Sequence, residues 1–106
     1  MITFKEFKNM EMKVGTITKV EDIPGSKNLI KFEVDLGGVT KQAVAGLKNI
    51  YKPEELEGKQ FVFVTNLEPA KLMGELSEVM ILAADDGNNI VLIKPEKNIS
   101  NGSLIK

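Results

Sequence analysis

Short apolar segments recur along this chain, and turn signals separate them about every ten residues. The clearest segment is residues 29–36, in which apolar side chains alternate strictly with charged ones. Strict alternation is typical of a β-strand with one face in the core and the other in water. The Gly37-Gly38 pair then predicts a tight turn into a strand over residues 39–45, and hence a hairpin. A chain divided in this way must build its core mainly from short strands.

The remaining segments follow the same pattern. Strands are predicted over residues 13–21, 60–65, 77–84 and 90–93, with a loop over residues 66–74. A helical turn is predicted over residues 51–58, because Pro53 suits the first helical position and Gly58 the exit. Asp85-Asp86-Gly87-Asn88 is expected to be a hairpin turn rather than a calcium loop, since the remaining ligands of such a loop are missing.

The N-terminal residues have the spacing of a helix start. In Thr3-Phe4-Lys5-Glu6, a threonine is followed three residues later by a glutamate, as in a capping box. A short helix over residues 3–9 would place Phe4 and Phe7 on one face. The alternative is an irregular arm with two buried phenylalanines.

Five or more short strands with one helical turn between the third and fourth indicate an all-β domain. In a chain of 106 residues, the economical closure is a five-stranded Greek-key barrel of the oligonucleotide/oligosaccharide-binding (OB) type, with terminal extensions. A small β-sandwich is the competing closure. The helical turn after the third strand favours the barrel. No linker or repeat divides the sequence, so residues 1–106 are expected to form one domain.

Missing residue types exclude most routes to catalysis. The chain has no cysteine and no histidine, so it lacks thiol nucleophiles, zinc ribbons, imidazole ligands and Ser–His pairs. No nucleophile–base pair is evident elsewhere. The protein is therefore expected not to be an enzyme, and to need neither cofactor nor metal.

The charge balance bears on possible partners. All 14 cationic side chains are lysines, and 15 acidic residues give a net charge of −1. A strongly cationic nucleic-acid binder is excluded, but a protein that gathers lysines on one face is not. No apolar stretch is long enough to span a membrane, and the charged N-terminus does not resemble a signal peptide. A cytoplasmic location is expected.

Several blocks in order resemble one family, the tRNA-binding domain of the endothelial-monocyte-activating-polypeptide type. The blocks are Met12-Lys13-Val14-Gly15, Val34-Asp35-Leu36-Gly37, Lys41-Gln42, Ala45-Gly46-Leu47, Pro53 to Gly58, and above all Asn66 to Ala84. Members of the family occur as the C-terminal domain or β subunit of methionyl-tRNA synthetase, as stand-alone tRNA-binding proteins, and as an export chaperone of the CsaA type.

The resemblance implies an OB barrel that binds the outer, elbow side of tRNA by shape and backbone more than by base sequence. It also implies a homodimer built from a barrel edge and the terminal extensions. A methionyl-tRNA synthetase catalytic chain is the implied partner enzyme, and the early Met1 suggests a separate subunit or stand-alone protein. Lysines stand at positions 13 and 41, where the family often has arginine; lysine keeps the charge but loses the planar fork.

Four lysines are candidate phosphate ligands. Lys41 and Lys13 match cationic positions of the family, Lys31 lies on the polar face of the 29–36 strand, and Lys71 lies in the expected loop. Each cation that neutralises a phosphate releases counterions and steepens the salt dependence of binding. The alternative for each is an ordinary solvated lysine.

Three further residues match family positions associated with RNA. Asn66 and Ser77 offer polar groups for backbone or 2′-hydroxyl contacts, and Met80 offers an adaptable apolar contact. The alternatives are a loop-capping asparagine, a turn serine and a core methionine. Aromatic residues suited to base stacking are scarce, which favours folded RNA over single strands.

Two other functions compete with a tRNA-binding module that assists a synthetase. One is a peptide-binding chaperone dimer, which the five methionines and the near-neutral charge favour. The other is an assembly domain that docks synthetases to one another. Lysines gathered near Ser77 and Met80 would favour tRNA, whereas an apolar groove across the dimer would favour peptide.

Overall fold

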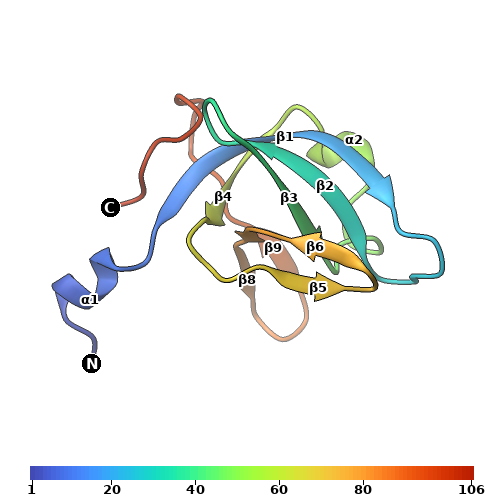
Figure 1. Ribbon diagram of the computed structural model, residues 1–106, viewed down its shortest axis with the longest axis horizontal. Helices are drawn as coiled ribbons and strands as arrows, with labels where there is room; N and C mark the ends of the chain where they lie inside the picture. Colours follow the sequence, from blue (N-terminus) through green and yellow to red (C-terminus); the bar gives the residue numbers. More distant parts are fainter.

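The computed structural model describes residues 1–106 and shows a nearly closed β-barrel from which both chain ends extend on the same side (Figure 1). The main sheet has five antiparallel strands in the order β3-β2-β1-β4-β7, and two hairpins, β5-β6 and β8-β9, accompany it. The elements are α1 (Phe4–Lys8), β1 (Met12–Asp22), β2 (Ile30–Asp35), β3 (Thr40–Ala45), α2 (Pro53–Leu56), β4 (Gln60–Val64), β5 (Ala70–Leu72), β6 (Glu75–Ser77), β7 (Met80–Ile81), β8 (Ala83–Asp85) and β9 (Ile90–Leu92).

Strand β1 takes part in both halves of the barrel. Its first half pairs with β4 and its second half pairs with β2, with a bulge between Ile17 and Lys19. A bulge bends a strand and increases its twist. Gly15 lies where β1 changes partners, and a Cβ there would come within 2.6 Å of Val34 Cγ1. Glycine therefore allows β1 and β2 to approach closely at this bend.

The core fills the barrel interior. Phe32 of β2 and Phe63 of β4 are both fully buried, with ring centroids 6.4 Å apart in a tilted arrangement. Tilted aromatic pairs are favoured over face-to-face ones. Helix α2 buries its Leu56 completely in the same cluster. The alternating positions of β2 thus point inward as their sequence pattern predicts.

Side chains complete the closure of the barrel along the free edge of β3. The Ser77 hydroxyl accepts a hydrogen bond from the Val44 N–H at 3.0 Å, and the Glu78 carboxylate accepts one from the Gln42 N–H at 3.0 Å. The Glu78 N–H donates to the Gln42 carbonyl at 2.8 Å, and the Gln42 amide donates to the Leu76 carbonyl at 2.8 Å. These four bonds take the place of a regular ladder between β3 and β6.

The C-terminal tail adds to the sheet beside β1. The Val14 N–H donates to the Ser103 carbonyl at 2.9 Å, and the Ile105 N–H donates to the Met12 carbonyl at 2.8 Å. The tail thus occupies the edge of β1 that β2 leaves free. It brings the C-terminus near α1, as Figure 1 shows.

The structure confirms the all-β class, the five-stranded OB-type barrel and both short helices. At α1, the Thr3 N–H donates to the Glu6 carboxylate at 3.0 Å and the Glu6 N–H donates to the Thr3 hydroxyl at 3.1 Å, so the capping box is present. The turn after β8 is a hairpin turn, in which the Asp86 carboxylate accepts backbone N–H groups. None of the helices is long and apolar enough to cross a membrane.

One loop prediction and one strand prediction are wrong. The expected loop over residues 66–74 contains β5, which pairs with β6 through a tight turn at Met73-Gly74. The expected strand over residues 77–84 is divided among β6, β7 and β8. It breaks after Ser77 because Ser77 and Glu78 bond to β3 through their side chains, while Val79 turns into the core.

Candidate nucleic-acid interface

Strand register places Lys13 and Lys41 at the same end of the barrel. Lys13 lies opposite Phe63, and Lys41 lies opposite Val34, in antiparallel pairs. Directly opposed residues project to the same side of a sheet, and both apolar partners are fully buried in the core. The two lysines therefore project from the inner face, at the end where β1 begins and the β2–β3 hairpin turns.

Each of these two lysines already has an acidic neighbour. Lys13 Nζ lies 3.6 Å from Glu11 Oε1, and Lys41 Nζ lies 3.8 Å from Glu78 Oε2. Both pairs are partly exposed, so each contributes little to stability. Their effect on a ligand is larger, because each carboxylate offsets the positive charge that a phosphate would meet.

Lys31 lies on the opposite face of β2 from the core. It alternates with Phe32 and is opposed by Val44, so it does not share a side with Lys13 and Lys41. Its ammonium lies 3.2 Å from Glu75 Oε2. The structure thus separates the lysines that the sequence places in one group.

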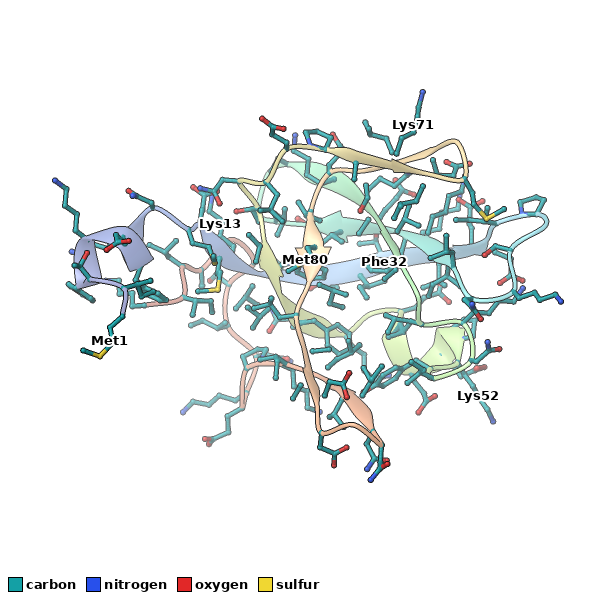
Figure 2. All side chains as sticks on the ribbon, turned by 90° about the horizontal axis from the view of Figure 1, so that it is seen from below. Met1, Lys13, Phe32, Lys52, Lys71 and Met80 are labelled. Carbon is teal, nitrogen blue, oxygen red and sulfur yellow. The ribbon has the colours of Figure 1, made fainter.

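Lys71 is the remaining candidate lysine. It lies on β5, with both neighbours exposed, and it makes no ion pair. Figure 2 shows its side chain pointing away from the barrel into solvent. Among the four candidates it is the one whose charge is not offset by a paired carboxylate.

Asn66 holds the N-terminal segment against the end of β4. Its amide oxygen accepts the Glu11 N–H at 2.9 Å, and its amide nitrogen donates to the Asn9 carbonyl at 2.7 Å. Ser77 is similarly engaged, since its hydroxyl accepts from Val44 and donates to the Val79 carbonyl at 3.2 Å. Both side chains therefore position neighbouring backbone near the lysines.

Met80 lies on the short edge strand β7, where its side chain is 48% exposed. Figure 2 shows it in front of the barrel in this view. An exposed, unbranched methionine can adapt to an apolar surface such as a ribose or a base. The alternative of a core methionine is therefore wrong.

Glu11 is a part of this surface that sequence reasoning missed. The Thr65 hydroxyl, which donates at 2.7 Å, and then the Lys13 ammonium hold the pKa of the Glu11 carboxyl below its ordinary value. The carboxylate is therefore ionised at neutral pH and pairs with Lys13. Glu75 and Glu78 were missed as well, because their positions beside lysines depend on pairing between distant strands. No group of three or more acidic side chains is placed to hold a metal ion.

An apolar groove lies between α1 and the C-terminal tail, next to Glu11. It encloses about 460 Å³ and is lined mainly by apolar side chains, namely Phe4, Phe7, Met10, Leu104 and Ile105. Phe4 is 71% and Leu104 54% exposed. Exposed apolar patches of this kind mark interaction sites.

A family model described as a putative tRNA-binding domain matches residues 12–104. Among curated proteins, the chain is 44% identical over 105 residues to the methionine–tRNA ligase of Pyrococcus furiosus, and 46% identical over 106 residues to that of Methanocaldococcus jannaschii. Each match covers 99% of this chain but only 14% and 16% of the ligases. The chain thus spans a small part of the length of these relatives.

Two solved structures have the same fold over the whole chain. A crystal structure of a MetRS-related protein from Pyrococcus horikoshii has a TM-score of 0.94 at 36% identity, covering 100% of this chain and 98% of that one. A crystal structure of the chaperone CsaA from Bacillus anthracis has a TM-score of 0.89 at 33% identity, covering 100% and 99%.

Proposed function

This chain belongs to the putative tRNA-binding domain family, and on that premise we propose that it is a non-catalytic module that binds folded tRNA. The observation that carries the proposal is the family match over residues 12–104, together with the register that brings Lys13 and Lys41 to one end of the barrel. Lysine ammonium groups suit phosphate as compact charges, and the planar arginine fork that binds a guanine edge with two parallel bonds is absent from this chain. The recognition is therefore of backbone and shape.

The proposed contact surface extends from this end of the barrel to the edge strands. Lys13 and Lys41 meet phosphates, Lys71 adds a flexible charge from β5, and Met80 supplies an apolar contact. Asn66 and Ser77 keep the backbone around these side chains in place, and any polar contact to the 2′-hydroxyl would share their existing hydrogen bonds. Few stacking aromatics are exposed, which suits structured RNA.

We also propose a methionyl-tRNA synthetase catalytic chain as partner, with the module acting as its β subunit or in trans. The support is the similarity to segments of methionine–tRNA ligases. Added phosphate contacts would raise the local concentration of tRNA at the catalytic chain. This role would place the protein in the cytoplasm. Adding the module to the catalytic chain should increase aminoacylation at limiting tRNA and leave the rate at saturating tRNA unchanged.

The terminal arms are proposed to form a homodimer interface. Ile2, Phe4 and Met10 in the N-terminal segment and Leu104 in the tail are all exposed. All of these except Ile2 line the apolar groove. Burying this surface against a second copy would remove apolar area from water at about 25 cal/mol per Å². The whole chain, residues 1–106, would then act as one unit of the dimer.

A titration tests the RNA proposal. Folded tRNA and a single-stranded RNA of equal length are titrated with the protein at low and at physiological salt. Preference for folded tRNA, with affinity that falls as salt rises, is the expected result. No binding to either RNA at low salt would overturn it.

The second candidate function is a peptide-binding chaperone dimer. It is favoured by the match to the CsaA chaperone and by the apolar groove beside α1. Protein that ignores both RNAs but suppresses aggregation of an unfolded client would support this function over tRNA binding.

A further inference from the structure

We propose that Glu75 limits the affinity of this protein for RNA by neutralising Lys31. The inference rests on the proposed tRNA-binding function and names a residue that sets its strength. Lys31 Nζ and Glu75 Oε2 lie 3.2 Å apart, the shortest of the five ion pairs in the molecule. Their side chains are only 24% and 30% exposed.

The fold holds this pair together from two sides. Lys31 is fixed on the outer face of β2, and Glu75 begins β6, which the Gln42 side chain ties to β3 through the Leu76 carbonyl at 2.8 Å. A longer contact of 3.5 Å joins the Gln42 amide to Glu75 Oε1. The carboxylate is thus held beside the ammonium by the same contacts that dock the β5–β6 hairpin.

Lys31 is closer to its carboxylate and less exposed than Lys13 and Lys41, whose carboxylates lie at 3.6 and 3.8 Å, so it contributes less to polyanion binding than they do. Binding of a phosphate to a free lysine releases counterions from the RNA, and this release drives association at low salt. Lys31 already has Glu75 as its counterion, so the pair presents no net positive charge to an arriving phosphate. The phosphate also meets the Glu75 carboxylate at close range. Lys31 lies on the outer face beside the β5–β6 hairpin that carries Lys71, and not with Lys13 and Lys41. Glu75 therefore keeps Lys31 from extending the RNA-binding surface from Lys71 along this face.

Glu33 offers a matched control. It lies two residues from Lys31 on the same outward face of β2 and makes no ion pair. Glu33→Gln changes the net charge by the same amount as Glu75→Gln, within the same region. Any difference between the two variants therefore reports the direct pair and not the overall charge.

The experiment measures the tRNA dissociation constant of the full chain against salt. Glu75→Gln should bind tRNA more tightly and steepen the slope of log K against log salt by about 0.9, so that its advantage shrinks about threefold from 50 to 200 mM salt. Glu33→Gln should give a smaller gain, and the double variant Lys31→Met with Glu75→Gln should return to the native affinity. Equal gains from Glu33→Gln and Glu75→Gln, or a gain that survives the loss of Lys31, would overturn the proposal.

A heparin column separates this inference from the RNA proposal. If the native chain binds no tRNA, the proposed function fails, and the Glu75 inference is decided by elution from heparin. Later elution of Glu75→Gln, lost again with Lys31→Met, would support it. Elution unchanged from the native chain would overturn it.

Discussion

The Ser77 hydroxyl accepts a 3.0 Å hydrogen bond from the Val44 backbone N–H, and so satisfies a donor on the last free edge of the barrel. Val44 is buried, and a buried donor left without a partner costs more than an average hydrogen bond contributes. The Ser77 side chain thus stabilises the closed barrel, and any contact with RNA would come in addition to this role.

Ser77→Ala should lower the free energy of unfolding by about 1–2 kcal/mol, because the Val44 N–H loses its acceptor. The midpoint of thermal unfolding should fall by roughly 4–16 °C, since each kcal/mol lowers it by about 4–8 °C in a domain of this size. Ser103→Ala is the control, since that exposed hydroxyl donates only to the nearby Ser100 carbonyl. Unchanged stability of the Ser77 variant in urea unfolding would contradict the closure role.

Gly15→Ala should destabilise the barrel by about 1–3 kcal/mol through overpacking. The added Cβ would lie 2.6 Å from Val34 Cγ1 and 2.8 Å from Leu36 Cδ2, both in the core. Gly46→Ala is the matched control, because a Cβ there meets nothing within 4 Å. Urea unfolding of both variants checks this, and equal midpoints would show that β1 can move away from β2 at little cost.

Sequence reasoning succeeded where local pattern and tertiary position agree. The alternation in β2 predicts its inward and outward faces, and Thr3 with Glu6 predicts the cap of α1. It failed at the β5–β6 hairpin because Met73 takes a positive φ of 49°, before Gly74 at 80°. Such turns are usually marked by Asn-Gly or Asp-Gly, so Met73-Gly74 gave no signal.

The candidate site shows the same division. The sequence shows lysines at positions 13, 31 and 41. It does not show on which face of the sheet each lysine lies, or which carboxylate each one pairs with. Those facts depend on register between distant strands, as with Lys41 and Glu78 or Lys31 and Glu75. Pairing across 37 or 44 residues leaves no local pattern in a single sequence.

Lys41→Ala should weaken tRNA binding and lower the salt slope by about one unit. Removing the ammonium deletes one phosphate contact and leaves the Glu78 carboxylate beside the RNA. Lys52→Ala is the control, since Figure 2 shows Lys52 pointing into solvent beside α2. Fluorescence titrations at several salt concentrations measure the slope, and a slope equal to that of the native chain would remove Lys41 from the site.

Thr65→Val should raise the pKa of Glu11 toward its ordinary value, because the hydroxyl that donates to the carboxylate is lost. A carboxyl with a lowered pKa in the folded state contributes stability above its unfolded pKa and loses it as pH falls through the folded pKa. The difference in stability between native and variant chains should therefore be present at neutral pH and shrink in acid. Carboxyl NMR titration measures the pKa directly.

Thr18→Val serves as the control for this titration, since the Thr18 hydroxyl reaches only the Glu33 backbone carbonyl, at 3.4 Å. It should leave the pKa of Glu11 in place. A Glu11 pKa that is the same in the native and Thr65→Val chains would show that Lys13 alone lowers it.

Light scattering at micromolar concentration should give the native chain twice the mass of its 11.7 kDa protomer. The double variant Phe4→Ser/Leu104→Ser should be monomeric. Both side chains are exposed on the terminal arms, outside the core cluster, so the monomer should unfold at nearly the native temperature. Ile90→Ser, an exposed position on β9, is the control and should stay dimeric. A native chain of monomeric mass would overturn the homodimer.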